Sequence, residues 1–220
     1  MNIDAFIKIR QAPVTFAITM VCLVVFLVTI GQSSSDAINS PLGQQLMLWG
    51  PVAAGQPWGW TRTITSGFLH LSAGHLIANM FMLALLGREV ERDLGWLSYV
   101  LVYLAGLLGA STLVLLFNPN TPTAGASGAV YAVMAVLVGV SARRGADLRA
   151  PIVLVLANLA YSVIVPGISL MGHLGGFLVG AVAAWPVTSP EPRRRVRAAV
   201  IIALLTAVAA GWAVHVNNTL

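Results

Sequence analysis

The sequence predicts an all-α fold, a polytopic membrane bundle of about seven helices. Of its 220 residues, 58% are hydrophobic and 9% are charged, against roughly 25% charged residues in an ordinary soluble domain. A water-soluble fold of this length cannot hide so much apolar surface. The apolar residues fall into seven runs that we interpret as membrane helices. The runs are Val14–Ile30, Leu71–Leu86, Leu97–Phe117, Ala129–Val140, Ile152–Val165, Leu170–Val187 and Val200–Val216.

The first run, Val14–Ile30, follows Lys8 and Arg10 as the apolar part of a signal peptide would. It is longer than the roughly 7–15 residues of such a region, and no small-x-small cleavage site follows, so we expect a retained anchor. The connection Gln32–Gly67 is apolar without periodicity and is interrupted by proline and glycine. Because its tryptophans favour the headgroup level, we expect turns that lie partly in the outer face of the membrane.

Several later runs are shorter than the roughly 20 residues of a full span. The shortest, Ala129–Val140, follows the polar loop Asn118–Ala126, so we expect this loop to dip below the outer surface. Non-helical backbone at that depth must be covered by protein or line a water-filled cavity. The final run, Val200–Val216, follows a linker rich in arginine and carries no interior polar cluster. We interpret it as an addition to a six-helix core.

The net charge of +5 is explained by membrane topology. With a cytoplasmic N-terminus, all but Arg62 of the 12 Lys and Arg residues fall on the cytoplasmic side, as the positive-inside rule requires. We therefore expect a multi-pass protein of a cell membrane, a bacterial plasma membrane given the compact loops, with an extracytoplasmic C-terminus and no nucleic-acid partner. Residues 1–12 form the predicted cytoplasmic segment, 13–188 the six-helix core, and 189–220 a cytoplasmic linker with the additional transmembrane helix.

Ser127 and His173 point most directly to chemistry. A polar or ionisable group inside hydrocarbon is costly and indicates function, and a serine within reach of a histidine base is the minimum for nucleophilic catalysis. Counted from the predicted cytoplasmic boundary of each run, Ser127 is 16 residues deep, and His75 and His173 are each 13 residues deep. At 1.5 Å per residue these depths are about 24 and about 20 Å. All three groups therefore share a level below the outer surface of a core about 30 Å thick.

Small residues lie beside both Ser127 and His173. Such faces let membrane helices approach backbone to backbone, so the short side chains next to them can meet across the contact. One face repeats at i, i+4, i+7 and i+11, and the other is a doubled GxxxG. The two sets are Gly128, Ala132, Ala135 and Gly139, and Gly172, Gly176 and Gly180.

His75 and Asn79 are i, i+4 neighbours on one helical face. Two nitrogen-bearing side chains aimed the same way can donate to a developing oxyanion. Zinc is a rival interpretation, against which HExxH is absent and asparagine is a poor ligand. A bridging structural role is a third. No Asp or Glu lies inside an apolar run, so a catalytic dyad is expected instead of a triad, with Tyr131 a candidate to pack on His173 and orient it.

With these residues in their order, the sequence resembles the rhomboid family of intramembrane serine proteases. The resemblance covers roughly residues 60–185. In one departure, Thr61 separates Trp60 from Arg62, where the family often has adjacent Trp-Arg. The matching motifs are His70-x4-His75-x3-Asn79, Gly125-Ala126-Ser127-Gly128 followed by Tyr131-Ala132, and Gly172-His173-x2-Gly176-x3-Gly180.

The resemblance implies that Ser127 is the nucleophile and His173 the base. It implies that His75, Asn79 and backbone amides near Ser127 and Ala126 hold the oxyanion, and that His70 is structural. The supporting residues of the same motifs are Gly125, Gly128 and Tyr131.

We therefore expect a serine endopeptidase that cuts membrane-protein substrates in or near their transmembrane segments, without metal or cofactor. The sequence does not specify an oligomeric state. One alternative is a catalytically inactive relative that only binds membrane clients, although such a protein usually lacks the serine or the histidine. Another is a transporter or channel with a histidine proton path, which needs more interior ionisable groups than this chain has.

Overall fold

The computed structural model describes residues 12–33 and 37–219. Within them every regular element is helical, and the predicted fold class, a multi-pass membrane helical bundle, is confirmed. The predicted segment 1–12 lies outside the described residues except for Ala12. The elements are α2 (Pro13–Gln32), η1 (Ala37–Asn39), α3 (Pro41–Leu46), α4 (Gly50–Gly55), η2 (Gly59–Thr61), α5 (Arg62–Thr65), η3 (Ser66–Phe68), α6 (Ala73–Met82), η4 (Leu83–Gly87), α7 (Arg88–Leu94), α8 (Trp96–Phe117), α9 (Ser127–Arg143), α10 (Arg149–Ile164), α11 (Leu170–Ala184) and α12 (Pro192–Thr219).

The helices of the described chain differ in length in the way that the short apolar runs predict. By length and hydropathy α2, α8 and α12 can each cross a membrane, and a fourth span is available if the bent pair Gly59–Phe68 and Ala73–Leu94 counts as one. The helices α9, α10 and α11 are apolar but shorter, at 17, 16 and 15 residues. At 1.5 Å per residue each is about 22–26 Å long, which is shorter than a hydrocarbon core of about 30 Å.

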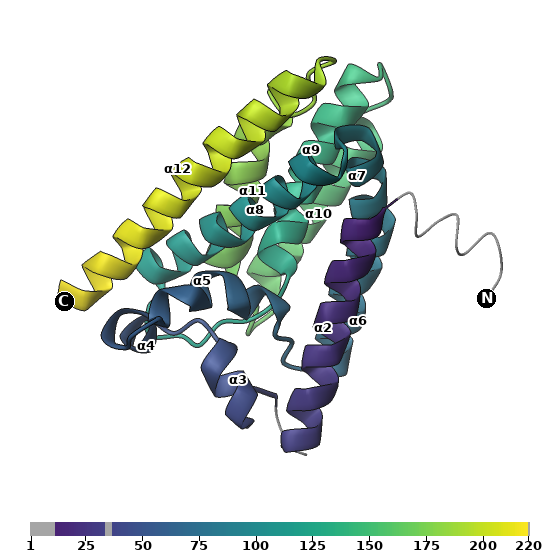
Figure 1. Ribbon diagram of the computed structural model, residues 1–220. Helices are drawn as coiled ribbons and strands as arrows, with labels where there is room; N and C mark the ends of the chain where they lie inside the picture. Colours follow the sequence, from purple (N-terminus) through teal and green to yellow (C-terminus); the bar gives the residue numbers. More distant parts are fainter. Residues whose placement is uncertain (1–11, 34–36, 220) are drawn as a thin grey trace.

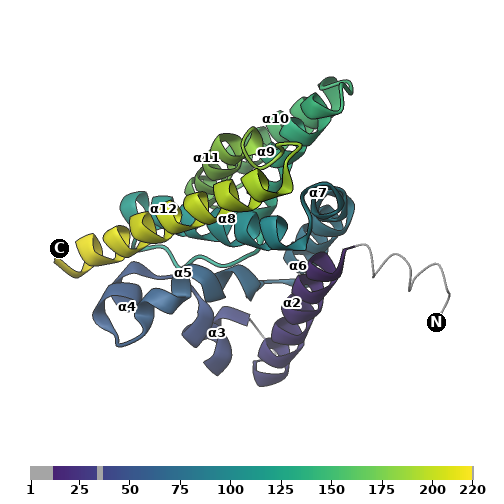
Figure 2. The same ribbon diagram turned by 45° about the horizontal axis from the view of Figure 1, so that its top comes forward.

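The bundle is built around α8, which crosses the centre of the molecule (Figure 1). The helices α9, α10 and α11 lie on one side of it, and α2, α6 and α7 on the other; Figure 2 shows the same division and places α10 at the edge. The additional C-terminal helix, α12, runs along α8. Near its end, the Asn217 amide donates to the carbonyl oxygen of Leu115 at 3.0 Å, which fixes this helix to the end of α8.

The connection between α2 and α6 folds into short helices rather than open turns. The buried Arg62 guanidinium donates to the carbonyl oxygens of Gln44 and Met47 at 2.6 and 2.9 Å. Arg62 therefore holds this connection together even though it does not adjoin a tryptophan in sequence. An antiparallel bridge between Leu48 and Thr123 ties the connection to the loop before α9. The bridge attaches the loop at Thr123, whereas Asn118, Asn120, Thr121 and Pro122 of the same loop are exposed, so the expected cover by protein is found only at the end of the loop next to α9.

At the opposite end of the molecule a buried carboxylate holds α2. Glu91 on α7 is 2% exposed, and its oxygens accept bonds from the backbone N–H groups of Val14 and Thr15 and from the Thr15 hydroxyl at 2.8–2.9 Å. These are among the N–H groups that the first turn of a helix leaves without intrahelical acceptors, and a negative charge at that end is favourable. The sequence analysis noted only that no Asp or Glu lies inside an apolar run, and it did not find this role.

Glycines bring α9 and α11 into backbone contact. A Cβ atom on Gly176 would lie 1.9 Å from the carbonyl oxygen of Gly128, and one on Gly180 would lie 2.3 Å from that of Ala132. No larger residue fits at either position without displacing a backbone. The predicted small-residue faces therefore meet each other, and this contact sets the positions of Ser127 and His173.

Candidate active site

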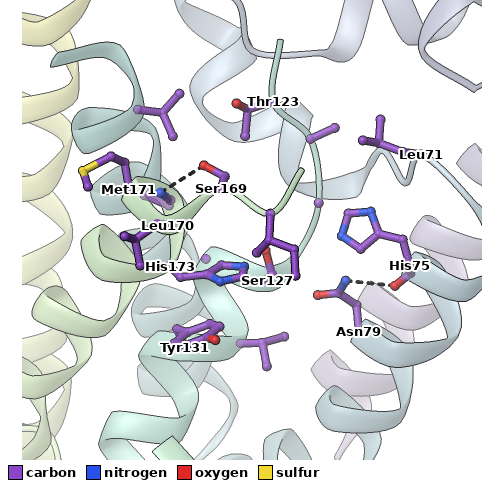
Figure 3. Close-up of a pocket in the computed structure, with 18 of the residues that line it drawn as sticks. Leu71, His75, Asn79, Thr123, Ser127, Tyr131, Ser169, Leu170, Met171 and His173 are labelled. Atoms are coloured by element: carbon purple, nitrogen blue, oxygen red, sulfur yellow. Dashed lines mark hydrogen bonds between the residues drawn. The ribbon is translucent and has the colours of Figure 1, made fainter. Parts of the chain in front are cut away.

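A cavity of about 880 Å³ opens between α6, α9, α10 and α11. Ser127, His173, His75, Asn79 and Tyr131, all predicted as site residues, line it. Figure 3 shows Ser127 and His173 next to each other on one side and His75 and Asn79 on the facing side. Three separate helices, α6, α9 and α11, thus contribute to one hollow, as the common depth of these residues predicts.

Ser127 is the first residue of α9. Gly125, two residues earlier, has φ +131°, a conformation that favours glycine, and its N–H donates to the Ser66 carbonyl oxygen at 2.9 Å. A Cβ atom on Gly125 would lie 2.8 Å from Nε2 of His75 and 3.7 Å from Oγ of Ser127. Gly125 is therefore needed both for the turn and for the approach of the His75 ring to Ser127.

His173 lies in the first turn of α11. A Cβ atom on Gly128 would lie 3.4 Å from the carbonyl oxygen of Gly172, so the sequence neighbours of Ser127 and His173 are also neighbours in space. Within the described chain the Ser127 hydroxyl makes no hydrogen bond of 3.5 Å or less, to His173 or to any other group. Hydrogen bonds between a nucleophile and its base are often looser without substrate and tighten when substrate binds.

The His173 ring is held from two sides. The Tyr131 ring stacks on it, with centroids 4.2 Å apart and 19° between the planes. Ser162 on α10 lies 2.6 Å from Nδ1 of His173 and 2.8 Å from the Tyr131 oxygen. Sequence analysis proposed the Tyr131 contact and missed Ser162, because nothing in a single sequence says which face of α10 is turned toward His173.

His75 and Asn79 face the cavity from α6. The backbone N–H of His75 donates to the Ser72 hydroxyl, which caps the helix, so this cap sets the start of α6. One Asn79 N–H bonds to the His75 carbonyl oxygen at 2.9 Å, as Figure 3 shows. An amide nitrogen carries two hydrogens, so Asn79 keeps a second donor.

The remaining predicted residues lie around this group. Ala126 is fully buried and is the N-cap of α9, where the first backbone N–H groups have no intrahelical acceptor. His70 is fully buried, with its ring edge-on to His75 at 5.1 Å, behind the cavity wall. Over the described residues, no group of three or more His, Cys, Asp or Glu side chains is arranged to hold a metal ion.

The site therefore brings together an alcohol, an imidazole and several N–H donors around one hollow. An alcohol beside an imidazole is suited to nucleophilic attack, and N–H donors on the facing wall are suited to stabilising a developing negative charge. Among the residues that the structure describes, no carboxylate lines the cavity, so the imidazole is oriented by an aromatic ring and a hydroxyl.

Comparison with known proteins matches residues 57–190 to the Rhomboid domain. Rhomboid protease GluP of Bacillus subtilis is 33% identical over 158 residues, 70% of this chain and 31% of that protein. RHOMBOID-like protein 4 of Arabidopsis thaliana is 30% identical over 129 residues, 56% of this chain and 32% of that protein. Rhomboid-type serine protease 2 of Emericella nidulans is 29% identical over 143 residues, 61% of this chain and 28% of that protein. The chain spans about a third of the length of these relatives.

Proposed function

This chain belongs to the rhomboid family, and on that premise we propose that it is an intramembrane serine endopeptidase. Its substrates are other membrane proteins, cut in or near a transmembrane segment. The observation that carries the proposal is that Ser127 and His173, from two helices in backbone contact, line one cavity. His75 and Asn79 on the facing wall support it, because they supply donors where the reaction needs them.

In the proposed reaction His173 acts first as a base. Its Nε2 takes the proton of the Ser127 hydroxyl as Oγ forms a bond to the substrate carbonyl carbon, and the carbonyl π electrons move to oxygen. When the carbonyl re-forms, the C–N bond breaks and the leaving nitrogen takes the proton from His173. Water then adds to the resulting ester with His173 again as base, which releases the new carboxyl terminus and restores the Ser127 hydroxyl.

The tetrahedral intermediate carries a negative oxygen that needs donors. We assign this role to the His75 ring, the second Asn79 N–H, and the backbone N–H groups near Ala126 and Ser127. Those backbone groups belong to the N-terminal end of α9, where the helix dipole also favours negative charge. Fixed donors of this kind stabilise the transition state without reorganisation.

Substrates of this site must expose a peptide bond that a helix would hide. Backbone N–H and C=O groups inside a transmembrane helix are bonded to each other, so we expect preference for segments with helix-weakening residues and a small residue at the cut. The cavity also lets in water for the second half of the reaction, because it lies at the end of three short helices rather than in mid-bundle.

We propose that this cavity faces the outside of a bacterial plasma membrane and that the N-terminus is cytoplasmic. Within the described residues every Lys or Arg other than Arg62 lies on α7, at the α9–α10 junction or in the first turns of α12. These segments lie together: Arg144 pairs with Asp93 at 2.9 Å and Glu89 at 3.8 Å, and Arg195 of α12 donates to the Asp93 carbonyl oxygen. The positive-inside rule puts this end in the cytoplasm.

The test is cleavage of a membrane-anchored reporter by the purified protein in liposomes. We expect Ser127→Ala and His173→Ala each to lower kcat by at least about 1,000-fold, because loss of either catalytic partner disables the pair. Ser98→Ala removes a buried hydroxyl that makes no hydrogen bond to the described chain and should keep wild-type activity. Wild-type turnover by Ser127→Ala contradicts the assignment. A folded wild-type protein that binds the reporter without cutting it supports a client-binding protein instead.

A further inference from the structure

The Ser162 hydroxyl joins α10 to the candidate base. Of the residues of α10, Val155 and Ser162 are buried, and Ser162 is 4% exposed. Its Oγ lies 2.6 Å from Nδ1 of His173, a short distance for a hydrogen bond to a ring nitrogen. This hydroxyl also meets two further groups, and together the three contacts determine which atom carries each proton.

The assignment of the protons begins with the Asn158 carbonyl oxygen, an acceptor that carries no hydrogen. The Ser162 hydroxyl donates to the carbonyl oxygen of Asn158 at 2.8 Å. A carbonyl can only accept, so all three contacts are hydrogen bonds only when the single Ser162 hydrogen points there. The Tyr131 oxygen lies 2.8 Å from the same Ser162 oxygen. With its hydrogen already used, Ser162 must accept from the Tyr131 hydroxyl and from His173. Its two lone pairs suffice for both.

The proton between Ser162 and His173 therefore belongs to Nδ1 of the imidazole. A neutral imidazole carries one hydrogen, so Nε2 is left with its lone pair. A base for the Ser127 hydroxyl needs a free lone pair on the nitrogen that faces it, and the usual device for securing it is a carboxylate bonded to the other nitrogen. Here the bonded group is a serine hydroxyl.

We propose that Ser162 is a positioning residue that keeps His173 in the tautomer with hydrogen on Nδ1. The inference rests on the proposed function, in which His173 is the base. Ser162 acts through His173, and its bond to Asn158 makes it an acceptor toward the ring. Tyr131 contributes twice, by stacking on the ring and by donating to Ser162. The Ser162 oxygen thus connects α9, α10 and α11 through its hydrogen bonds.

A purely structural role makes different predictions. Serines in membrane helices often bond to the carbonyl four residues earlier, as Ser162 does with Asn158. If that bond were the whole purpose, removal of the hydroxyl would change stability but not the tautomer of His173. The tautomer is therefore the readout that separates the two roles.

The experiment records ¹⁵N NMR spectra of protein labelled at histidine, with the His173 signals identified by comparison with His173→Ala. In wild type we expect hydrogen on Nδ1 and a lone pair on Nε2. We expect Ser162→Ala to increase the share with hydrogen on Nε2, and Ser162→Thr, which keeps a hydroxyl at the same position, to restore the wild-type spectrum. Hydrogen on Nε2 in wild type overturns the proposal, and that result needs no variant to fold.

Cleavage of the membrane-anchored reporter provides the second readout. Ser162→Ala should lower kcat by about 10- to 100-fold with little change in KM, since one buried N–H loses its acceptor, and Ser162→Thr should recover most of it. The Ser98→Ala control should change neither the spectrum nor kcat. An unchanged tautomer together with unchanged kcat in Ser162→Ala overturns the proposal. The spectrum can also be recorded in Ser127→Ala protein, so a failure of the proposed function leaves the tautomer result readable.

Discussion

Two of the helices packed against α9, α11 and α10, hold it in different ways. Against α11 the contact is backbone to backbone: Cβ atoms on Gly176 and Gly180 would lie 1.9 and 2.3 Å from carbonyl oxygens of α9. Against α10 the contact is made by side chains, and an apolar cavity of about 360 Å³ lies between α9, α10 and α11. Ser127 and His173 lie at the tight contact between α9 and α11, whereas Ser162 lies on α10, which packs more loosely against α9.

This difference indicates which side chains need the most accurate placement. In the proposed reaction Ser127 and His173 must come within hydrogen-bond distance, and short side chains on helices in backbone contact need little movement to reach it. For Ser162, only its hydroxyl oxygen has to be positioned. Three hydrogen bonds place it, two of them to side chains of α9 and α11, although the rest of α10 packs sparsely.

The largest effect should come from adding one methyl group to the tight contact. Gly176→Ala places a Cβ atom against the Gly128 carbonyl, and a backbone atom cannot turn aside as a side chain can. We expect the free energy of unfolding in detergent to fall by about 3 kcal/mol, with loss of reporter cleavage.

Gly211→Ala is the matched control for that change. Gly211 lies inside α12, and no heavy atom of the described chain outside its own helical turn would lie within 4 Å of a Cβ atom at this position. The same substitution should therefore be neutral or stabilise the helix by up to about 1 kcal/mol. Equal destabilisation by Gly176→Ala and Gly211→Ala would show that backbone contact does not distinguish the two positions.

A smaller effect should distinguish the side-chain packing of α9 from that of α10. Val133 on α9 is fully buried, whereas Val163 on α10 is 68% exposed. We expect Val133→Ala to lower the free energy of unfolding by about 1–2 kcal/mol through lost packing, and Val163→Ala to change it by less than about 0.5 kcal/mol. Equal losses at the two positions would mean that α10 is packed as tightly as α9, against the structure.

Much of this architecture is predictable from sequence because it depends on local patterns. The apolar runs predict the membrane helices, and the glycine spacing of Gly172, Gly176 and Gly180 predicts a close helix contact. Common depth predicts that Ser127, His173 and His75 line one cavity. Each of these inferences needs only helix geometry and the thickness of a membrane.

The missed features depend on which faces pack together. Ser162 is one of several polar residues in α10, and only the packing of α10 against α9 and α11 shows that it reaches His173. Glu91 looks like an ordinary acid at a helix end, yet it caps α2 from α7. Short helices in the α2–α6 connection depend on Arg62, whose carbonyl partners are 15 and 18 residues away in sequence.

The most direct measurement is covalent labelling by a fluorophosphonate, followed by mass spectrometry of the labelled peptide. The serine oxygen displaces fluoride from phosphorus only when a base removes its proton, so the probe reports the activated nucleophile itself. We predict a label on Ser127 in the wild-type protein, its loss in His173→Ala, and its retention in Ser98→Ala. A well-folded wild-type protein that takes up no label, or takes it up on another serine, would contradict the account.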